Sequence, residues 1–286
     1  NEMSYAIMDA YYDMNLPQPI LSVKLHKNTP AKLYKEMGKF MFTPGVLTPS
    51  FFNDDTVFEA LKGGKVEEKD LPDYSVAGCQ EPLIMGKDNG NTTNSWFNLP
   101  KILELTLTGG KSTITGEEIG TFVEYPDTKT LLENIREAFY KNAEKFAQEM
   151  ADAANGASLA LSHLRVPFLS AFMGGCESGI DTRHPSKQGT KYNGSGCLIH
   201  GTSVIADSFS AIDKLLSERP EDADRLVYAI KANFVGYEEL QEFLLSADKF
   251  GNNIEKVDNY AAEVASKVAD IVANAKNYLG NSFRPD

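Results

Sequence analysis

Residues 73–82, DYSVAGCQEP, place a thiol and a carboxyl two positions apart, with a glycine before them and a proline after. Pro82 disfavours helical backbone in the residue that precedes it, so the tripeptide from Cys79 to Glu81 is expected to be extended. Side chains at positions i and i+2 of an extended segment point to the same side, which predicts that Cys79 and Glu81 project into one space. Gly78 lacks a Cβ and therefore permits the tight backbone path of a loop tip.

This pairing suits hydrogen-atom transfer better than ionic nucleophilic chemistry. A cysteine that acts as an ionic nucleophile needs a neighbouring cation to favour the thiolate, whereas the neighbour predicted for Cys79 is an acid. Hydrogen-atom transfer requires a neutral S–H group. A carboxyl such as that of Glu81, if water is excluded from it, can exchange a proton near neutral pH. The alternative interpretation is a buried structural cysteine beside an ordinary turn.

The Gly-Cys-x-Glu-Pro pattern at residues 78–82 resembles the cysteine loop of the glycyl radical enzymes, the family of pyruvate formate-lyase and the radical diol dehydratases. Other stretches follow in the order and approximate spacing of that family: residues 18–26 (QPILSVKLH), residues 51–54 (FFND), Tyr192-Asn193 and residues 206–208 (ADS). The resemblance therefore covers most of the chain.

The resemblance implies specific roles for several side chains. Cys79 would become a thiyl radical that takes a hydrogen atom from the substrate, and Glu81 would serve as acid or base. The segment after the cysteine loop lines the substrate pocket in this family, which makes Thr92, Thr93 and Trp96 candidates for contacts with a small polar substrate. The alternative for these three residues is a solvated turn followed by a packed tryptophan.

The implied reaction is hydrogen abstraction followed by elimination, as in a dehydratase or a C–N or C–S lyase, or by decarboxylation. Acyl transfer of the formate C-acetyltransferase kind is an alternative. It would require Cys176 or Cys197 beside Cys79, because formate-lyases of this family use adjacent cysteines and the neighbour here is Gly78. An inactive fragment or scaffold is the non-enzymatic alternative.

The family carries its radical on a glycine in an Arg-Val-x-Gly-Tyr-type motif near the C-terminus, where a radical-SAM activating enzyme installs it. Residues 1–286 contain no such motif. We therefore expect one internal portion of the barrel domain, inactive in isolation, that binds no cofactor and whose glycyl radical domain lies outside this chain. The family also implies a homodimer.

The composition excludes several other classes of protein. A hydrophobic content of 42% describes a soluble globular protein, and a net charge of −12 argues against nucleic-acid and anionic membrane partners. No apolar run is long enough for a membrane span. Three cysteines without a framework of spacings fit reduced thiols in the cytoplasm. A metal is not expected, because the spacings among the cysteines and histidines match no paired-ligand pattern.

Strand-like and helix-like patterns alternate, which predicts an α/β fold. Strands are expected at residues 20–26 and 51–54, with a buried strand or loop at 167–172. The expected helices span residues 4–14, 30–42, 55–62, 99–108, 131–154, 201–217, 220–233, 238–246 and 254–278. Residues 65–70 are expected to be a charged surface connection, and residues 87–94 a turn. The resemblance implies that these elements form part of a ten-stranded β/α barrel, with helices outside and the cysteine loop in the lumen.

Overall fold

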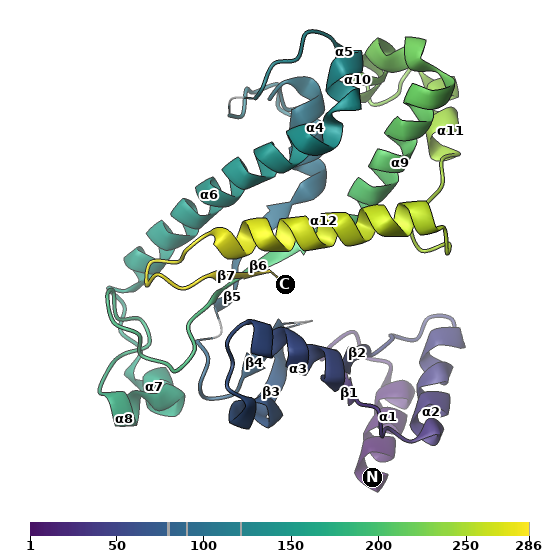
Figure 1. Ribbon diagram of the computed structural model, residues 1–286. Helices are drawn as coiled ribbons and strands as arrows, with labels where there is room; N and C mark the ends of the chain where they lie inside the picture. The colour runs from purple at the N-terminus through teal and green to yellow at the C-terminus, as the bar shows by residue number, and fades with distance from the viewer. Residues whose placement is uncertain (79–80, 90, 121, 286) are drawn as a thin grey trace. The chain divides into compact units, whose positions relative to one another are not determined.

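The computed structural model describes residues 1–78, 81–89, 91–120 and 122–285, and for residues 91–94 only the backbone (Figure 1). The chain divides into two compact units, each assembled from separate stretches of sequence. The smaller unit comprises Asn1–Gly90, Pro167–Gly179 and Gly189–Asn193. The larger unit comprises Asn91–Val166, Ile180–Gln188 and Gly194–Asp286.

The smaller unit is built from short elements. Its helical segments are α1 (Glu2–Met14), α2 (Ala31–Phe42), α3 (Asp54–Gly63), the 3-10 helix η1 (Glu68–Asp73), α7 (Pro167–Ser170), a helical segment at Ala171–Gly175, and α8 (Cys176–Ser178). Its strands form two pairs: β1 (Ser22–Leu25) runs parallel to β2 (Ser50–Asn53), and β3 (Tyr74–Ala77) runs antiparallel to β4 (Glu81–Ile84).

Two small apolar cores hold the smaller unit together. Met8, Met37 and Phe40 are buried between α1, α2 and the β1–β2 pair. A second cluster of four buried residues lies beneath the β3–β4 hairpin, and it consists of Val66, Leu71, Tyr74 and Ile84. The β3–β4 hairpin thus packs on apolar residues of its own unit.

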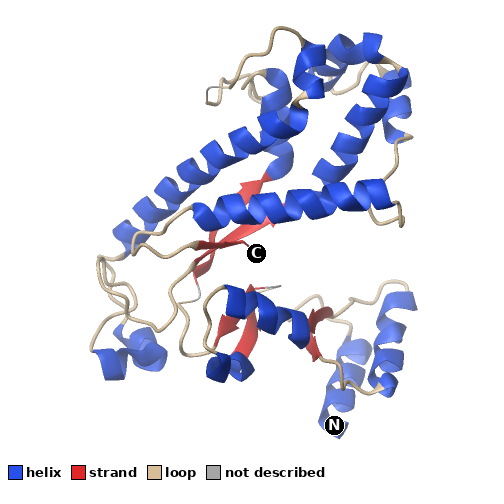
Figure 2. Cartoon of the chain, in the orientation of Figure 1, coloured by secondary structure: helices blue, strands red, loops and turns tan. Residues whose placement is uncertain are grey.

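The larger unit is mainly helical (Figure 2). Its helices are α4 (Leu99–Thr108), α5 (Thr128–Glu133), α6 (Ile135–Leu161), α9 (Thr202–Glu218), the 3-10 helix η3 (Pro220–Asp222), α10 (Ala223–Lys231), α11 (Glu238–Leu245) and α12 (Glu255–Asn274). Its strands β5 (Asn91–Asn98), β6 (Ser195–His200) and β7 (Phe283–Pro285) form a parallel sheet in that order.

One face of this parallel sheet packs against helices. Phe97 of β5, Cys197 of β6 and Phe283 of β7 belong to the same buried cluster as residues of α4, α6, α9 and α12. In that cluster Phe139 of α6 meets Phe209 of α9 edge-on, with ring centroids 5.8 Å apart. Because successive residues of a strand alternate between faces, the residues between these core positions project from the opposite face of the sheet.

Helix α6 is longer than expected. Gly156 was predicted to end it, and this is wrong, since the helix continues to Leu161. A glycine inside a helix costs only about 1 kcal/mol relative to alanine. Here the buried faces of Ala154 and Ser158, on either side of Gly156, pack inward and offset that cost.

Three further local expectations are wrong. Residues 65–70 are not simply a surface connection, because Asp70 in η1 is only 2% exposed. The polar stretch predicted as a turn becomes strand from Asn91 onward, since its backbone pairs with β6. Residues 167–172 are helical rather than a buried strand or loop, and Phe168 is 80% exposed.

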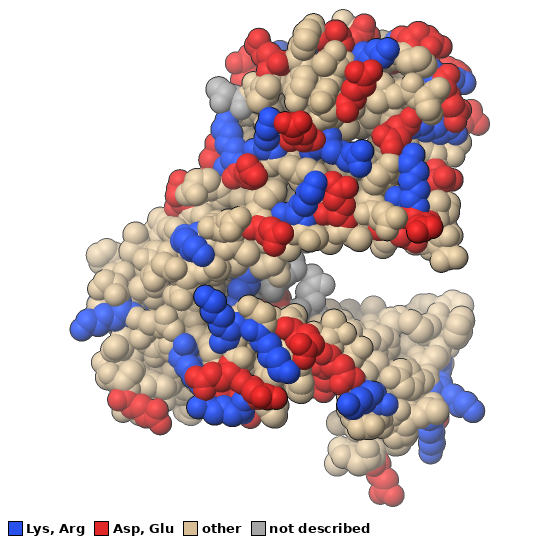
Figure 3. All heavy atoms as spheres, viewed as in Figure 1, with Lys and Arg blue, Asp and Glu red and all other residues tan. Residues whose placement is uncertain are grey.

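Acidic and basic side chains are interspersed over the face of the protein seen in Figure 3. Within the described ranges, no helix combines the length and the apolar character needed to cross a bilayer. The chain is an α/β protein, as the alternating patterns predicted.

Candidate active site

The β3–β4 hairpin carries the cysteine loop at its tip. In the register of the two strands Ala77 pairs with Glu81. Gly78 has a φ of +56°, in the left-handed region that favours glycine, as predicted for a tight loop tip. Cys79 and Gln80 lie outside the described residues, so the proximity of the thiol to the acid stays a prediction.

Glu81 is buried at the start of β4, with only 4% of its surface exposed. Its carboxylate folds back over the loop: a Cβ added to Gly78 would lie 2.7 Å from Oε2 and 3.2 Å from Oε1 of Glu81. The glycine therefore serves two purposes, because it adopts the required backbone angle and leaves space for the carboxylate. The acid is held directly against the residue that precedes Cys79.

Asp70 anchors the base of this hairpin. Its carboxylate accepts hydrogen bonds from Lys87 Nζ at 2.8 Å, Lys191 Nζ at 2.5 Å and the Tyr192 hydroxyl at 2.6 Å. Asp70 precedes β3, Lys87 follows β4, and residues 191–192 come from a segment far along the chain. Asn89 N also donates to the carbonyl oxygen of Tyr192 at 3.0 Å. These bonds join both ends of the hairpin to the segment Gly189–Asn193.

The charges of this anchor reinforce one another. Hydrogen bonds from Lys191, Lys87 and Tyr192 hold the pKa of Asp70 well below its usual value. The hydrogen bonds to Asp70 in turn raise the pKa of Lys191 and that of Lys87. Asp70, Lys87 and Lys191 are therefore all charged at neutral pH. The motif pair Tyr192-Asn193 was noted in the sequence, but nothing local indicated that Asp70 was its partner.

Tyr74 makes a second connection, to the elements before the hairpin. Its hydroxyl donates to Asp54 at the start of α3. Lys24 Nζ of β1 donates to the Tyr74 carbonyl oxygen at 3.1 Å and lies 3.7 Å from the centre of the tyrosine ring. Burial and the neighbouring carboxylate of Asp54 raise the pKa of the Tyr74 phenol. The hairpin is thus tied on both sides within the smaller unit.

The three candidate substrate contacts all lie on β5, in the larger unit. The side chains of Thr92 and Thr93 are outside the described set, so their role stays a prediction. The side chain of Trp96 is 66% exposed. Its ring stacks on the imidazole of His200, with ring centroids 4.8 Å apart and an angle of 14° between the planes.

Comparison with known proteins assigns the family. A family model described as pyruvate formate lyase-like matches residues 1–286, the whole chain. The chain belongs to the glycyl radical enzymes. It is 29% identical to the trans-4-hydroxy-L-proline dehydratase of Clostridioides difficile and 27% identical to the (2S)-3-sulfopropanediol dehydratase of Klebsiella oxytoca. Both matches cover 100% of this chain, and they cover 36% and 35% of the respective relatives.

Solved structures show the same relationship. A glycyl radical enzyme from Archaeoglobus fulgidus superposes with a TM-score of 0.85 at 27% identity, over 100% of this chain and 36% of that protein. The fold is therefore part of the glycyl radical enzyme barrel, as the cysteine-loop resemblance implied. The chain spans about a third of the length of the curated relatives it matches.

The other two cysteines of this glycyl radical enzyme chain differ in environment. Cys197 is fully buried on the helix side of the sheet, with its Sγ 3.3 Å from Sδ of Met150. Its thiol is thus enclosed in the core of the larger unit. Cys176 is exposed on α8 of the smaller unit. Among the residues that the structure describes, no group of three or more His, Cys, Asp or Glu is arranged to hold a metal ion.

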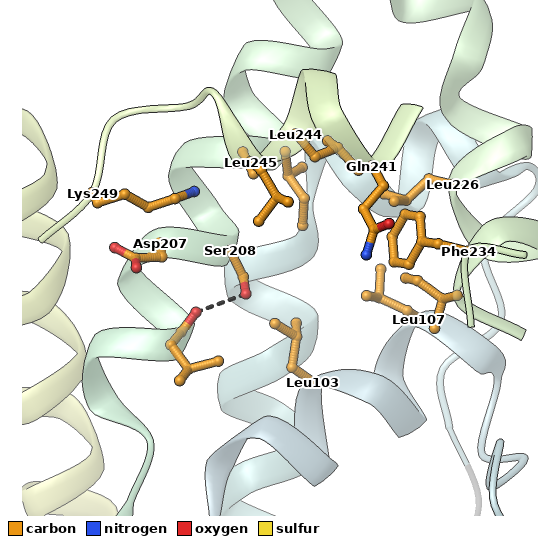
Figure 4. Close-up of a pocket in the computed structure, with 14 residues that line it drawn as sticks. Leu103, Leu107, Asp207, Ser208, Leu226, Phe234, Gln241, Leu244, Leu245 and Lys249 are labelled. Atoms are coloured by element: carbon orange, nitrogen blue, oxygen red, sulfur yellow. Dashed lines mark hydrogen bonds between the residues drawn. The ribbon is translucent and has the colours of Figure 1, made fainter. Parts of the chain in front are cut away.

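An apolar pocket of about 390 Å³ lies on the helical side of the larger unit, between α4, α9, α10 and α11 (Figure 4). Leu103, Leu107 and Leu244 form part of its wall, and Asp207 and Lys249 lie at one end. The Asp207 carboxylate accepts a hydrogen bond from Phe250 N at 2.8 Å and so holds the loop after α11. Asp207 of the 206–208 stretch thus connects α9 to that loop.

Proposed function

We propose that this chain supplies the hydrogen-abstracting thiol and the acid–base carboxyl of a glycyl radical lyase acting on a small polar substrate. The observation that carries the proposal is Glu81, a buried carboxylate folded over Gly78 within the Gly-Cys-x-Glu-Pro loop. If the thiol of Cys79 lies near this acid, as predicted, the acid disfavours thiolate formation and so favours the neutral S–H that radical chemistry needs.

The reaction balances with these two residues. In this family a glycyl radical, installed by an activating enzyme, supplies the unpaired electron. A sulfur-centred radical at Cys79 takes a hydrogen atom from a substrate C–H, which forms S–H and leaves a carbon radical. Glu81 exchanges a proton with the substrate hydroxyl or the leaving group as the adjacent bond breaks. The product radical then takes the hydrogen atom back from Cys79, so the thiyl is regenerated and no net oxidant is consumed.

Dehydration and C–S bond cleavage are both represented among the relatives, which also include an isethionate sulfite-lyase of Oleidesulfovibrio alaskensis. The two relatives described above are both dehydratases, of a hydroxylated amino acid and of a sulfonated diol. C–N or C–S bond cleavage and decarboxylation use the same first step and remain alternatives within the class. Acyl transfer has less support, because Cys197 is enclosed in the core and the residue before Cys79 is glycine.

The chamber in which this chemistry takes place is proposed to be the barrel lumen, with the cysteine loop inside it. Excluding water and oxidants from such a chamber protects radical intermediates. Thr92, Thr93 and Trp96 are proposed to contact the substrate. The radical-bearing glycine is proposed to lie on a segment outside this chain, which a radical-SAM activating enzyme would reach. A homodimer and a cytoplasmic location belong to the same proposal.

Anaerobic activation of the full-length protein tests the proposal. A radical-SAM activase should generate a glycyl EPR doublet, and small diols, hydroxyprolines, aminoalcohols and arylacetates would then be screened for turnover. Cys79→Ala should abolish turnover and keep the EPR doublet. Glu81→Gln should lower kcat by about 100-fold or more. Cys176→Ala, an exposed thiol, is the matched control and should retain turnover. Turnover by Cys79→Ala at the wild-type rate would refute the radical mechanism.

A further inference from the structure

The hairpin of β3 and β4 depends on its surroundings for its position. In the described part of the chain the two strands form a sheet of their own. Their register pairs Tyr74 with Ile84 at the open end of the hairpin, where β3 begins and β4 ends, and Ala77 with Glu81 at the other end. A two-stranded hairpin is marginally stable at best in water. The place of Glu81 is therefore set by the contacts that hold the open end, about 10 Å away along β4.

Tyr192 joins the segments that enter and leave this open end. Its hydroxyl donates to Asp70 Oδ2 at 2.6 Å and accepts from Glu67 N at 2.9 Å, which connects it to the segment before β3. Its backbone N donates to the Lys87 carbonyl oxygen at 2.8 Å, and its carbonyl oxygen accepts from Asn89 N at 3.0 Å, which connects it to the segment after β4. Its ring packs on the apolar cluster beneath the hairpin.

The Tyr192 hydroxyl has a role that can be separated from the packing of its ring. The apolar cluster needs only an aromatic ring at this position, which phenylalanine would also supply. The hydroxyl adds a hydrogen bond to Asp70, a carboxylate that is 2% exposed, and bonds to ionised groups are stronger than bonds between neutral groups. Asp70 keeps Lys87 and Lys191 as partners when the hydroxyl is removed, so no buried charge is left unpaired.

We infer that Tyr192 is a positioning residue for Glu81, acting through Asp70 and the paired strands of the hairpin. By fixing the open end of the hairpin, the Tyr192 hydroxyl limits the tilt of β4 and so the movement of the Glu81 carboxylate over Gly78. All of these residues belong to the smaller unit. This inference rests on the proposed function, since it takes Glu81 to be the catalytic acid or base.

Tyr192→Phe tests the inference, because it removes the hydroxyl and keeps the ring. In the unactivated full-length protein, amide hydrogen exchange of peptides from residues 74–84 should become about tenfold faster, since opening the hairpin no longer breaks that bond to a charged group. After anaerobic activation, kcat per glycyl radical should fall about tenfold while KM changes less than about twofold, since a displaced catalytic group loses rate. Dividing by the radical content measured by EPR removes differences in activation.

Tyr260→Phe is the matched control. Tyr260 also donates its phenol to a carboxylate, that of Asp213, and this bond joins α12 to α9 in the larger unit. The control loses the same kind of hydrogen bond, but hairpin exchange and kcat should both stay at the wild-type values. A difference between the two variants would therefore not be a consequence of lower overall stability.

The inference is overturned if Tyr192→Phe keeps the wild-type exchange rate of the hairpin or the wild-type kcat, or if Tyr260→Phe lowers kcat equally. An activated wild type without turnover would refute the proposed function, and this inference with it. Wild-type turnover that Tyr192→Phe matches would refute this inference alone, so the two failures are distinguishable.

Discussion

The carboxylate of Glu81 occupies the space that a side chain at Gly78 would fill, with Oε2 only 2.7 Å from the position of a Cβ there. Two residues of the Gly-Cys-x-Glu-Pro pattern are therefore coupled sterically across the loop tip. The glycine is needed for its left-handed backbone angle and also for its missing Cβ. The contact with Glu81 therefore explains why a glycine is needed at position 78, whatever the role of Cys79.

Gly78→Ala should impair turnover much more than stability. The added methyl group would displace the Glu81 carboxylate, and a catalytic group moved by about 1 Å can cost about 100-fold in rate. The backbone angle alone should cost about 1–2 kcal/mol of unfolding free energy. Turnover of the activated full-length protein and thermal melting measure the two effects.

Gly179→Ala is the matched control for this substitution. Gly179 has a similar φ of +67°, but among the described residues no atom beyond its two chain neighbours lies within 4 Å of the position of its Cβ. It should show the same loss of stability with kcat unchanged. Equal kcat values for the Gly78 and Gly179 variants would show that the carboxylate does not need the space above Gly78.

Asp70→Asn should destabilise the protein at neutral pH and progressively less in acid. The pKa of Asp70 is lowered in the folded state by Lys191, Lys87 and Tyr192, relative to about 3.9 in the unfolded chain. Its stabilising contribution is therefore fully present above about pH 5 and is lost as the pH falls through the folded-state pKa. The difference in melting temperature between wild type and variant should stay constant from pH 8 to pH 5 and shrink below about pH 4.

Asp73→Asn provides the comparison. Asp73 also binds Lys87 at 2.8 Å, but its side chain is 53% exposed. An exposed ion pair contributes little, so this variant should melt close to the wild type. If the Asp70 and Asp73 variants had the same melting temperature at pH 7, the buried ion pairs of Asp70 would stabilise the protein no more than the exposed pair of Asp73.

Gly201→Ala should disrupt the connection between β6 and α9. Gly201 has a φ of +91°, and a Cβ there would lie 2.4 Å from both Cγ and Cδ of Pro100 in the first turn of α4. Backbone strain and overpacking together predict a loss of about 3 kcal/mol of unfolding free energy. Gly280 has a comparable φ of +82°, and among the described residues no atom beyond its chain neighbours lies within 4 Å of the position of its Cβ. Gly280→Ala should therefore lose only about 1–2 kcal/mol of unfolding free energy. Urea denaturation distinguishes these values, and similar losses would argue against the contact with Pro100.

Phe209→Ala should remove a central contact of the larger unit. The ring is 1% exposed and meets Phe139 edge-on, so the expected loss is about 3–5 kcal/mol. Phe250→Ala, at a ring that is 46% exposed, should lose less than about 1 kcal/mol. Denaturation followed by circular dichroism measures both, and a small effect at Phe209 would mean that the helices repack around the cavity.

Local signals in the sequence were sufficient wherever the structure depends on near neighbours. Helix α4 begins and ends where predicted, because the Asn98 side chain caps its first turn and Gly109 ends it in the left-handed conformation. The same holds for the left-handed backbone at Gly78. Local signals failed at Gly156, where the packing of the whole helix outweighs the low helix propensity of one glycine.

The amino-acid order alone was enough to predict the family and the α/β class, since a motif and its backbone angles depend on residues adjacent in the chain, and the chemistry of the loop stays a prediction. Only the tertiary structure decided that Asp70 is buried among cations from distant segments, that the carboxylate of Glu81 lies over Gly78, and that Trp96 stacks on His200. Burial and side-chain pairing depend on which distant segments meet in the folded chain, and no local pattern encodes those meetings.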